Sequence, residues 1–166
     1  NAEFARKNFR PLVSTALPYY PQQAIALPPF STMLSWAKKQ KFDMIHLSTP
    51  GPVGLCGWLI ARWLRIPFAA TYHTDFPAYV DRLSGSRIVT GGTSVFMKWF
   101  YRPATLVFAR SREYHEILIK LGIAPNRLRT IRPAINLRRF NADYRNPDIW
   151  QRFGVTEPLR LLYIGG

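Results

Sequence analysis

The chain has 166 residues, of which 48% are hydrophobic and 14% aromatic, and 23 Lys and Arg against 9 Asp and Glu give it a net charge of +14. This length suits one domain, or one domain and the start of another, and the apolar content excludes a disordered chain. The positive charge predicts an anionic partner, either nucleic acid, an anionic membrane or a phosphorylated small molecule, without choosing among them.

Several classes of protein are excluded by simple features of the sequence. The longest apolar stretch, residues 53–64, contains Arg62 and is shorter than the roughly 20 residues that a membrane-spanning helix needs. The first eleven residues are polar and basic and do not have the pattern of a signal peptide. The single cysteine, Cys56, excludes an internal disulfide and is expected in the core. The three histidines are too scattered for a zinc motif, so we expect no metal and no cofactor.

The N-terminal part is dominated by proline. The first thirty residues are rich in Pro and aromatic side chains, which predicts an extended, packed connection without regular structure. Ser31 or Thr32 is then expected to cap a short helix that runs to Lys39.

Residues 42–72 have the pattern of a β-α-β unit. A buried strand, in which His46 is expected to be a core residue, leads through the tight loop Thr49-Pro50-Gly51-Pro52 into the apolar helix at 53–64 and a second buried strand at 68–72. The strands should be parallel and joined by a right-handed crossover. Their carboxyl ends then meet at the edge where open α/β sheets bind ligands, so the loops at Thr49 and His73 should face one crevice.

A second unit of the same kind follows. Residues 77–92 look mixed in structure, and a helix is predicted over residues 94–101, whose aromatic side chains suit either core packing or a membrane interface. A strand over residues 105–109 leads to Ser111, which is expected to cap the next helix, and a last strand is predicted at 128–131. Together the elements predict an α/β fold with parallel strands and helices on both faces of the sheet.

The C-terminal part changes in character. Residues 136–156 are polar and basic and predict a linker, with a short helix that ends near residue 153. Residues 159–164 are predicted to form a new buried strand that leads into two glycines, a weak signal for a phosphate-binding turn.

Two motifs resemble a known enzyme family. The run from Phe42 to Gly54, with Thr49-Pro50-Gly51-Pro52 at its centre, and the run Tyr72-His73-Thr74-Asp75-Phe76-Pro77 are similar in order and spacing to retaining GT-B glycosyltransferases. This large family includes bacterial phosphatidylinositol mannosyltransferases and sulfoquinovosyl- and glucosyl-diacylglycerol synthases. Further matches are Trp99-Phe100-Tyr101, Ser111 with Tyr114, Gly122-Ile123, Phe140 and Leu162-Tyr163-Ile164-Gly165.

The resemblance implies an organisation and an activity. Residues 1–135 would form the second half of an N-terminal, acceptor-side Rossmann-like domain, residues 136–156 an interdomain linker, and residues 157–166 the first strand of a truncated donor-side domain. The enzyme would transfer a hexose from a UDP or GDP sugar to a lipid or glycan acceptor with retention of configuration and without a metal. It would work in the cytoplasm or peripherally on the inner face of the membrane, and the isolated segment, without a donor-binding domain, is expected to be inactive.

Each candidate site residue has a functional and a structural interpretation. By resemblance His73 lines the sugar-transfer centre; alternatively it is hydrogen-bonded beneath a loop. Thr49, Pro50 and Gly51 precede a helix N-terminus, whose free N–H groups attract a phosphate or hydroxyl, or they form a tight turn chosen for packing. Asp75 binds an acceptor hydroxyl or caps its own loop, and Ser111 binds substrate or is only a helix cap.

Departures from the family pattern leave two alternatives open. Ala134-Ile135-Asn136 stands where the family has Gly-apolar-Asp, and no glycine-rich turn precedes the first motif, so the chain could be an inactive remnant. The net charge alone would suit a basic nucleic-acid-binding module. We expect no nucleic-acid partner, because no single helix carries a dense basic stripe and the aromatic residues fall mainly in predicted core positions.

Overall fold

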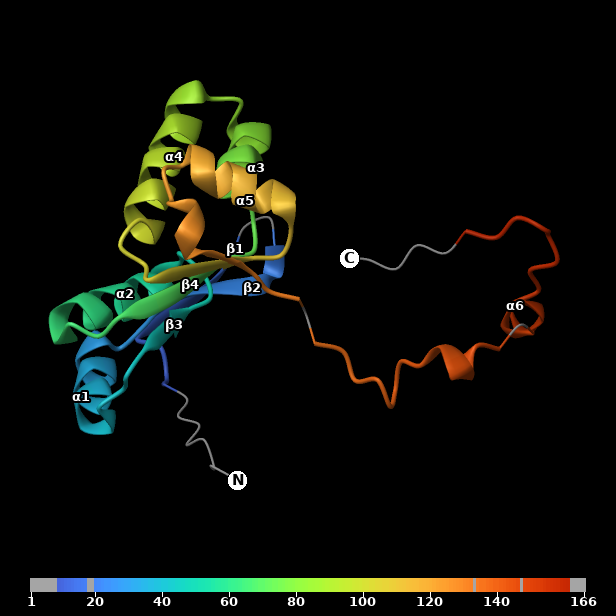
Figure 1. The fold of residues 1–166 in the computed structure, drawn as a ribbon, viewed down its shortest axis with the longest axis horizontal. Helices are drawn as coiled ribbons and strands as arrows, with labels where there is room; N and C mark the ends of the chain where they lie inside the picture. Colours follow the sequence, from blue (N-terminus) through green and yellow to red (C-terminus); the bar gives the residue numbers. More distant parts are fainter. Residues whose placement is uncertain (1–8, 18–19, 133, 147, 162–166) are drawn as a thin grey trace. The chain divides into compact units, whose positions relative to one another are not determined.

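The computed structural model describes residues 9–17, 20–132, 134–146 and 148–161 (Figure 1). The chain divides into two compact units, Asn1–Arg132 and Pro133–Gly166. The first unit contains β1 (Val13–Leu17), β2 (Tyr20–Leu27), α1 (Phe30–Gln40), β3 (Ile45–Leu47), α2 (Pro52–Leu64), β4 (Phe68–Tyr72), α3 (Phe76–Ser84), α4 (Arg87–Tyr101), β5 (Leu106–Ala109), α5 (Arg112–Lys120), the 3-10 helix η1 (Pro125–Arg127) and β6 (Leu128–Thr130).

A parallel four-stranded sheet is the centre of the first unit. Its strands follow one another in the order β3-β4-β5-β6, with Leu47 opposite Ala70 and Ala109 opposite both Tyr72 and Thr130. Both predicted β-α-β units are therefore confirmed, as is the α/β fold with a Rossmann-like parallel sheet.

The helices that join these strands lie on one face of the sheet. Because the strand order is the sequence order, right-handed crossovers place every connecting helix on the same side. Side chains from α2, α4 and α5 accordingly share one core cluster with Leu47, Ala70 and Val107, which lie on that face. His46 and Phe108, one residue out of phase, lie on the opposite face with their rings 5.8 Å apart. The expectation of helices on both faces is thus wrong for the described part of the sheet.

Aromatic side chains fill the main core. Tyr72 is fully buried and contacts Tyr101 of α4 and Tyr114 of α5 edge-on, with ring centroids 5.6 and 5.3 Å apart. The Tyr101 hydroxyl donates a hydrogen bond of 3.0 Å to the buried Thr71 carbonyl. Tyr101 therefore fixes α4 against β4, directly beneath the carboxyl end of that strand. Cys56 lies in a second cluster between α1 and α2, which confirms its expected core position.

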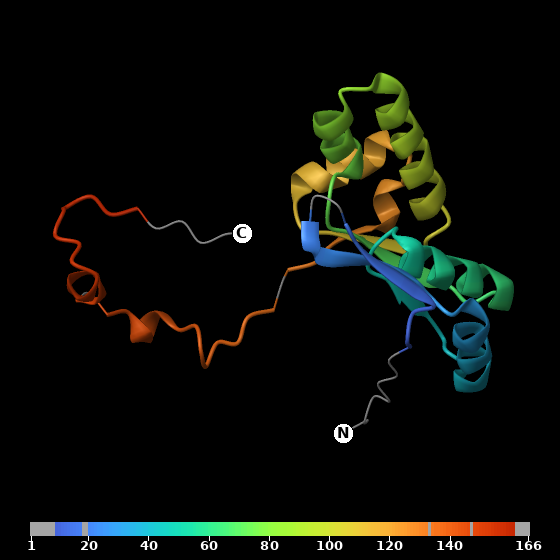
Figure 2. The same cartoon turned by 180° about the vertical axis from the view of Figure 1, so that it is seen from behind.

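The proline-rich N-terminal segment forms a hairpin, so the prediction of irregular structure is wrong. β1 and β2 pair antiparallel, with Val13 opposite Leu27 and Ala16 opposite Ala24, and Figure 2 shows the hairpin close to α2, which β2 contacts. Pro21 is tolerated because the register shifts after Ala16, so that no pairing is needed at its position. The strand register, rather than the proline count, decided the conformation.

Three helices differ from what the sequence predicted. Residues 77–92 were predicted to be mixed, but they form α3 and the first part of α4. Asp75 caps α3, Pro77 stands in its first turn where no backbone donor is needed, and Gly85 ends it at a φ of 59°. α1 begins at Phe30 without a side-chain cap, so neither Ser31 nor Thr32 is its N-cap.

His46 is not the core residue that its place in a strand predicted. It is exposed, and its Nε2 lies 2.6 Å from the Thr71 hydroxyl. The alternation along β3 turns Leu47 toward the helices and His46 toward the face without them.

The second unit contains the 3-10 helix η2 (Ala142–Tyr144) and α6 (Ile149–Arg152), which confirms a short helix ending near residue 153. Of the strand predicted over residues 159–164, residues 159–161 are not in a strand, and 162–166 lie outside the described residues. Throughout the described residues, no helix is both long and apolar enough to span a bilayer.

Candidate functional site

The candidate residues follow the carboxyl ends of three neighbouring strands. Thr49 and its loop follow β3, His73 follows β4, and Ser111 follows β5. Parallel pairing brings these three ends to the same edge of the sheet. β3 ends at Leu47, opposite Ala70, whereas β4 continues to Tyr72. The Thr49 loop is therefore set back from His73 along the strand direction.

His73 is exposed at this edge directly after the last residue of β4. Partial burial, together with the nearby charges of Arg110 and His46, lowers the pKa of His73 below its ordinary value. The imidazole is therefore neutral at pH 7, with one nitrogen free to donate and the other to accept a hydrogen bond. Such a ring suits a sugar hydroxyl better than a charged phosphate.

Asp75 holds the turn after His73 in place. One of its carboxylate oxygens accepts from the Tyr72 hydroxyl at 3.1 Å and from the Ala78 backbone N–H at 3.3 Å. Burial, followed by the negative charge and hydrogen bond of Asp75, raises the pKa of Tyr72 far above its usual range, so the phenol stays protonated as a donor. Both contacts are made by the same oxygen, Oδ1. Asp75 is therefore the N-cap of α3, and this structural role does not depend on whether Asp75 also binds the acceptor substrate.

The loop from Thr49 to Gly51 is fixed by a close approach to α2. Gly51 is the N-cap of the helix, and its carbonyl accepts from the Leu55 N–H at 2.8 Å. A Cβ on Gly54 would lie 1.6 Å from the Thr49 carbonyl oxygen, so only glycine lets the loop lie against the first turn of the helix. Thr49 is exposed while Pro50 is buried, which presents the threonine and the helix N-terminus at the sheet edge.

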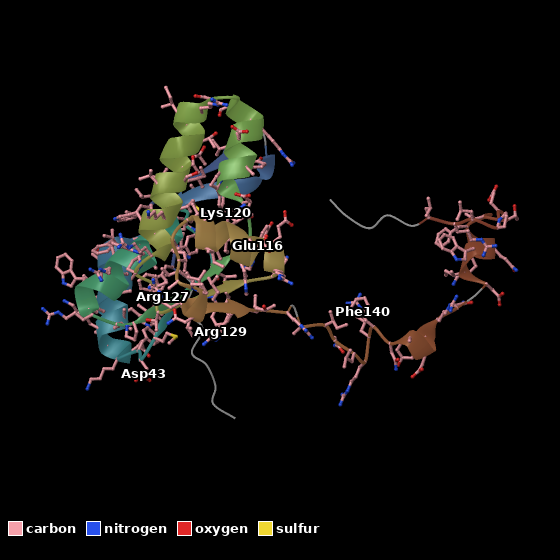
Figure 3. All side chains as sticks on the ribbon, turned by 45° about the horizontal axis from the view of Figure 1, so that its top comes forward. Asp43, Glu116, Lys120, Arg127, Arg129 and Phe140 are labelled. Carbon is pink, nitrogen blue, oxygen red and sulfur yellow. The ribbon has the colours of Figure 1, made fainter. Side chains whose placement is uncertain are left out.

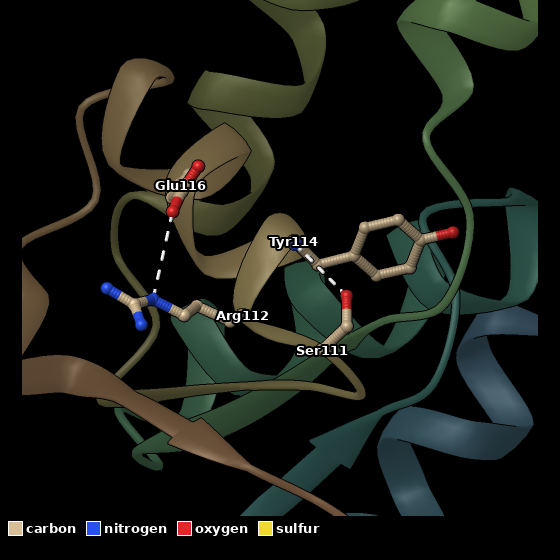
Figure 4. Close-up of polar contacts among 4 residues, drawn as sticks. All are labelled: Ser111, Arg112, Tyr114 and Glu116. Atoms are coloured by element: carbon tan, nitrogen blue, oxygen red, sulfur yellow. Dashed lines mark hydrogen bonds and ion pairs between the residues drawn. The ribbon is translucent and has the colours of Figure 1, made fainter.

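Ser111 is the N-cap of α5, as its position predicted. Its hydroxyl accepts from the Tyr114 backbone N–H at 3.2 Å, and in the next turn Arg112 pairs with Glu116 at 3.9 Å (Figure 4). Ser111 is half-buried, so the capping hydroxyl stays beside the edge that carries His73.

Arg110 is a member of this edge that the sequence analysis missed. It directly follows Ala109, the residue paired with Tyr72, and therefore stands beside His73, whose pKa its charge depresses. Arg110 is exposed. A charged residue immediately after a buried strand, in register with His73, was the signal available in the sequence.

The site has no metal-binding character in the part of the chain that the structure describes. No group of three His, Cys, Asp or Glu side chains there comes close enough to hold a metal ion. The chemistry available at the edge is hydrogen bonding by a neutral imidazole, hydroxyls and a helix N-terminus, with positive charge from Arg110.

Comparison with known proteins decides the family. The model of glycosyltransferase family 4 matches residues 1–139. The chain belongs to this family. The match supports the glycosyltransferase interpretation over that of a basic nucleic-acid-binding module, and it includes every residue of the edge described above.

Three curated proteins are similar to parts of this chain. The sulfoquinovosyl transferase SQD2 of Arabidopsis thaliana is 30% identical over 148 residues, which is 89% of this chain and 29% of that protein. An alpha-monoglucosyldiacylglycerol synthase of Streptococcus pneumoniae is 40% identical over 60 residues, 36% of this chain and 14% of that protein. A GDP-mannose-dependent alpha-mannosyltransferase of Mycobacterium tuberculosis is 28% identical over 111 residues, 67% of this chain and 29% of that protein. The chain spans less than a third of each relative.

Proposed function

We propose that this chain is the acceptor-side part of an enzyme that transfers a hexose from a nucleotide sugar to a lipid acceptor with retention of configuration. The observation that carries the proposal is the shared sheet edge after which His73, Arg110 and the Thr49 loop follow their strands, in a chain of glycosyltransferase family 4. Residues 1–135 supply this acceptor side, residues 136–156 form the linker, and residues 157–166 begin the donor-side domain.

The reaction replaces one bond at the anomeric carbon of the sugar. The acceptor hydroxyl forms a bond to that carbon on the face from which the diphosphate departs, so the configuration is retained. The bond to the nucleoside diphosphate breaks, and the diphosphate leaves with the electron pair and takes up the hydroxyl proton. His73 orients the transferring sugar by a hydrogen bond to one of its hydroxyls, a contribution of geometry and electrostatics. Thr49 and the N–H groups of the α2 N-terminus bind acceptor oxygens, Asp75 and Ser111 border the acceptor, and Arg110 adds positive charge where the diphosphate develops negative charge.

The altered linker motif is compatible with an active enzyme. Asn136 stands where the family has Asp, and its Oδ1 accepts from the backbone N–H groups of Arg138 and Arg139 at 3.0 and 3.3 Å. An aspartate in the same turn would make the same contacts with a carboxylate oxygen. The substitution therefore keeps the turn.

The nature of donor and acceptor follows from the named relatives. One relative is named for a glucosyldiacylglycerol product and another for GDP-mannose, which supports a UDP or GDP hexose as the donor and a lipid as the acceptor. A lipid acceptor requires contact with a membrane, and the net charge of +14 favours an anionic surface. The enzyme would then act from the cytoplasm on the inner face of the membrane.

The test is a transfer assay on the enzyme that carries this chain together with a donor-binding domain. UDP-glucose and GDP-mannose are each offered with diacylglycerol in mixed micelles, and the anomeric configuration of the product is read from its proton NMR couplings. We expect transfer from one donor into a glycolipid with the donor's own α-configuration. A product of inverted configuration, or no glycolipid from either donor, contradicts the proposal.

A further inference from the structure

The outward surface of helices α2 and α4 exposes a run of apolar side chains. On α4, Ile88, Val95 and Trp99 are 87%, 68% and 47% exposed, and their spacing of seven and four residues puts them on one face of the helix. On α2, Leu59 and Trp63 are 48% and 68% exposed. Exposed apolar side chains gathered on one part of a surface usually mark a contact with a partner or a membrane.

Two indole rings join the helices into one rigid surface. Trp58 of α2 and Trp99 of α4 have ring centroids 4.4 Å apart, and the Trp58 Nε1–H donates to the Phe100 carbonyl at 3.2 Å. A groove of about 540 Å³ runs beside them, lined by residues of both helices. The surface is therefore preformed and does not depend on a loop.

The groove carries only positive charge among its described lining residues. Arg62 comes from α2, and Lys98 and Arg102 come from the last turn of α4 and its cap, while no acidic side chain lines the groove. The Arg62 guanidinium lies 5.8 Å from the centre of the Trp58 ring. All three cations are exposed, so each can reach a ligand outside the protein.

The neighbouring helix α5 lacks this combination. Its exposed side carries Glu113 and Glu116 together with Arg112 and Lys120, and Arg112 is paired with Glu116 (Figure 3 labels Glu116 and Lys120). Mixed charge of this kind gives no net attraction for an anionic surface. α5 therefore supplies a matched control on the same unit.

We propose that the α2–α4 surface, formed by the groove residues Arg62, Val95, Lys98, Trp99 and Arg102, docks onto an anionic lipid bilayer. Indole rings favour the boundary between headgroups and acyl chains, and cations beside them meet lipid phosphates. The occupant is a bilayer because apolar side chains and cations alternate over an extended helical face. The inference rests on the proposed function in one respect, the membrane location of the acceptor, and it assigns the part of the chain that makes the contact.

The test is co-sedimentation of the chain with vesicles of phosphatidylglycerol and phosphatidylcholine at low salt. R62Q/R102Q should weaken binding to phosphatidylglycerol vesicles about 30-fold, because each cation near the surface contributes about fivefold. R112Q/K120Q removes the same charge from α5 and should weaken binding to these vesicles no more than about threefold. Trp99→Gln should weaken binding at least about fivefold, whereas Ile119→Gln, at an exposed position of α5, should not change it.

Three outcomes overturn the assignment. The first is an equal loss of vesicle binding for R62Q/R102Q and R112Q/K120Q. The second is a larger loss of binding for K38Q/K39Q on α1 than for R62Q/R102Q. The third is that the unmodified chain binds phosphatidylglycerol vesicles no better than phosphatidylcholine vesicles. Because sedimentation needs neither donor nor turnover, its failure is separate from that of the proposed function. An enzyme that makes glycolipid in detergent but fails these comparisons refutes only the docking surface.

Discussion

Substitution of Gly54 by alanine tests whether the loop before α2 is held as tightly as its geometry requires. A Cβ at this position would lie 1.6 Å from the Thr49 carbonyl oxygen and 2.8 Å from the Thr49 carbonyl carbon. A carbon–oxygen contact needs about 3.3 Å, so the loop or the helix must move by roughly 1.7 Å. Both obstructing atoms belong to the backbone, which cannot turn aside as a side chain does.

The change that Gly54→Ala should cause in the free energy of unfolding is the difference between two opposing effects. Alanine is more favourable than glycine by about 1 kcal/mol in a helix interior, which is an upper limit for Gly54 in the first turn of α2. Overpacking costs about 1–3 kcal/mol, and the rigid backbone of Thr49 places this site at or above the upper end. Gly54→Ala should therefore destabilise the first unit by about 2 kcal/mol, which lowers the melting temperature by about 4–8 °C for a domain of this size.

The assay is urea and thermal unfolding followed by circular dichroism, with Gly91→Ala as the matched control. Gly91 also lies within a helix, α4, but a Cβ there would meet nothing within 4 Å. Gly91→Ala should raise stability by up to about 1 kcal/mol, the opposite sign to Gly54→Ala. If both variants gain stability alike, the close approach of Thr49 to α2 is wrong, and with it the placement of the loop at the candidate site.

Three further substitutions test single contacts of the core and the edge. Tyr101→Phe removes the hydrogen bond to the buried Thr71 carbonyl and should cost about 1–3 kcal/mol in urea unfolding; an unchanged midpoint would contradict that bond. Ser111→Ala should cost about 1 kcal/mol through loss of the α5 cap, and a loss of a few tenths would mean that water replaces the hydroxyl. Arg110→Gln should raise the pKa of His73 toward about 6.5, because it removes a nearby positive charge. An NMR titration in which the His73 midpoint stays constant would show that the charge of Arg110 does not act on His73.

Secondary-structure elements could be predicted from the sequence where a local signal agreed with the tertiary structure. The strands that became β4 and β5 are short apolar runs, of which β4 directly follows Pro67, and Ser111 stood where a helix cap was needed. Such elements are defined by residues within a few positions of one another. The order of the β-α-β units then fixed which loops share an edge, and the edge could be predicted from the sequence.

The features that the sequence did not predict depend on pairing between distant residues. The hairpin formed because a register shift removed the need for pairing at Pro21, and a count of prolines does not contain that information. His46 became an exposed residue because strand order placed all connecting helices on the other face. Arg110 was missed because its importance comes only from the pairing of Ala109 with Tyr72, which puts it beside His73.

The central claim is that His73 contacts the transferring sugar, and a paired comparison of His73→Ala with His46→Ala tests it most directly. Both histidines are exposed near the same edge, and the charge of His46 is felt at His73, but His46 lies on the sheet face away from the helices. In the enzyme that carries this chain, His73→Ala should lower kcat roughly 100-fold with little change in melting temperature, as when a positioned polar group is lost at the transition state. His46→Ala should keep nearly normal kcat. If His73→Ala retains its activity while its melting temperature falls, His73 supports the loop beneath it and the transfer centre lies elsewhere.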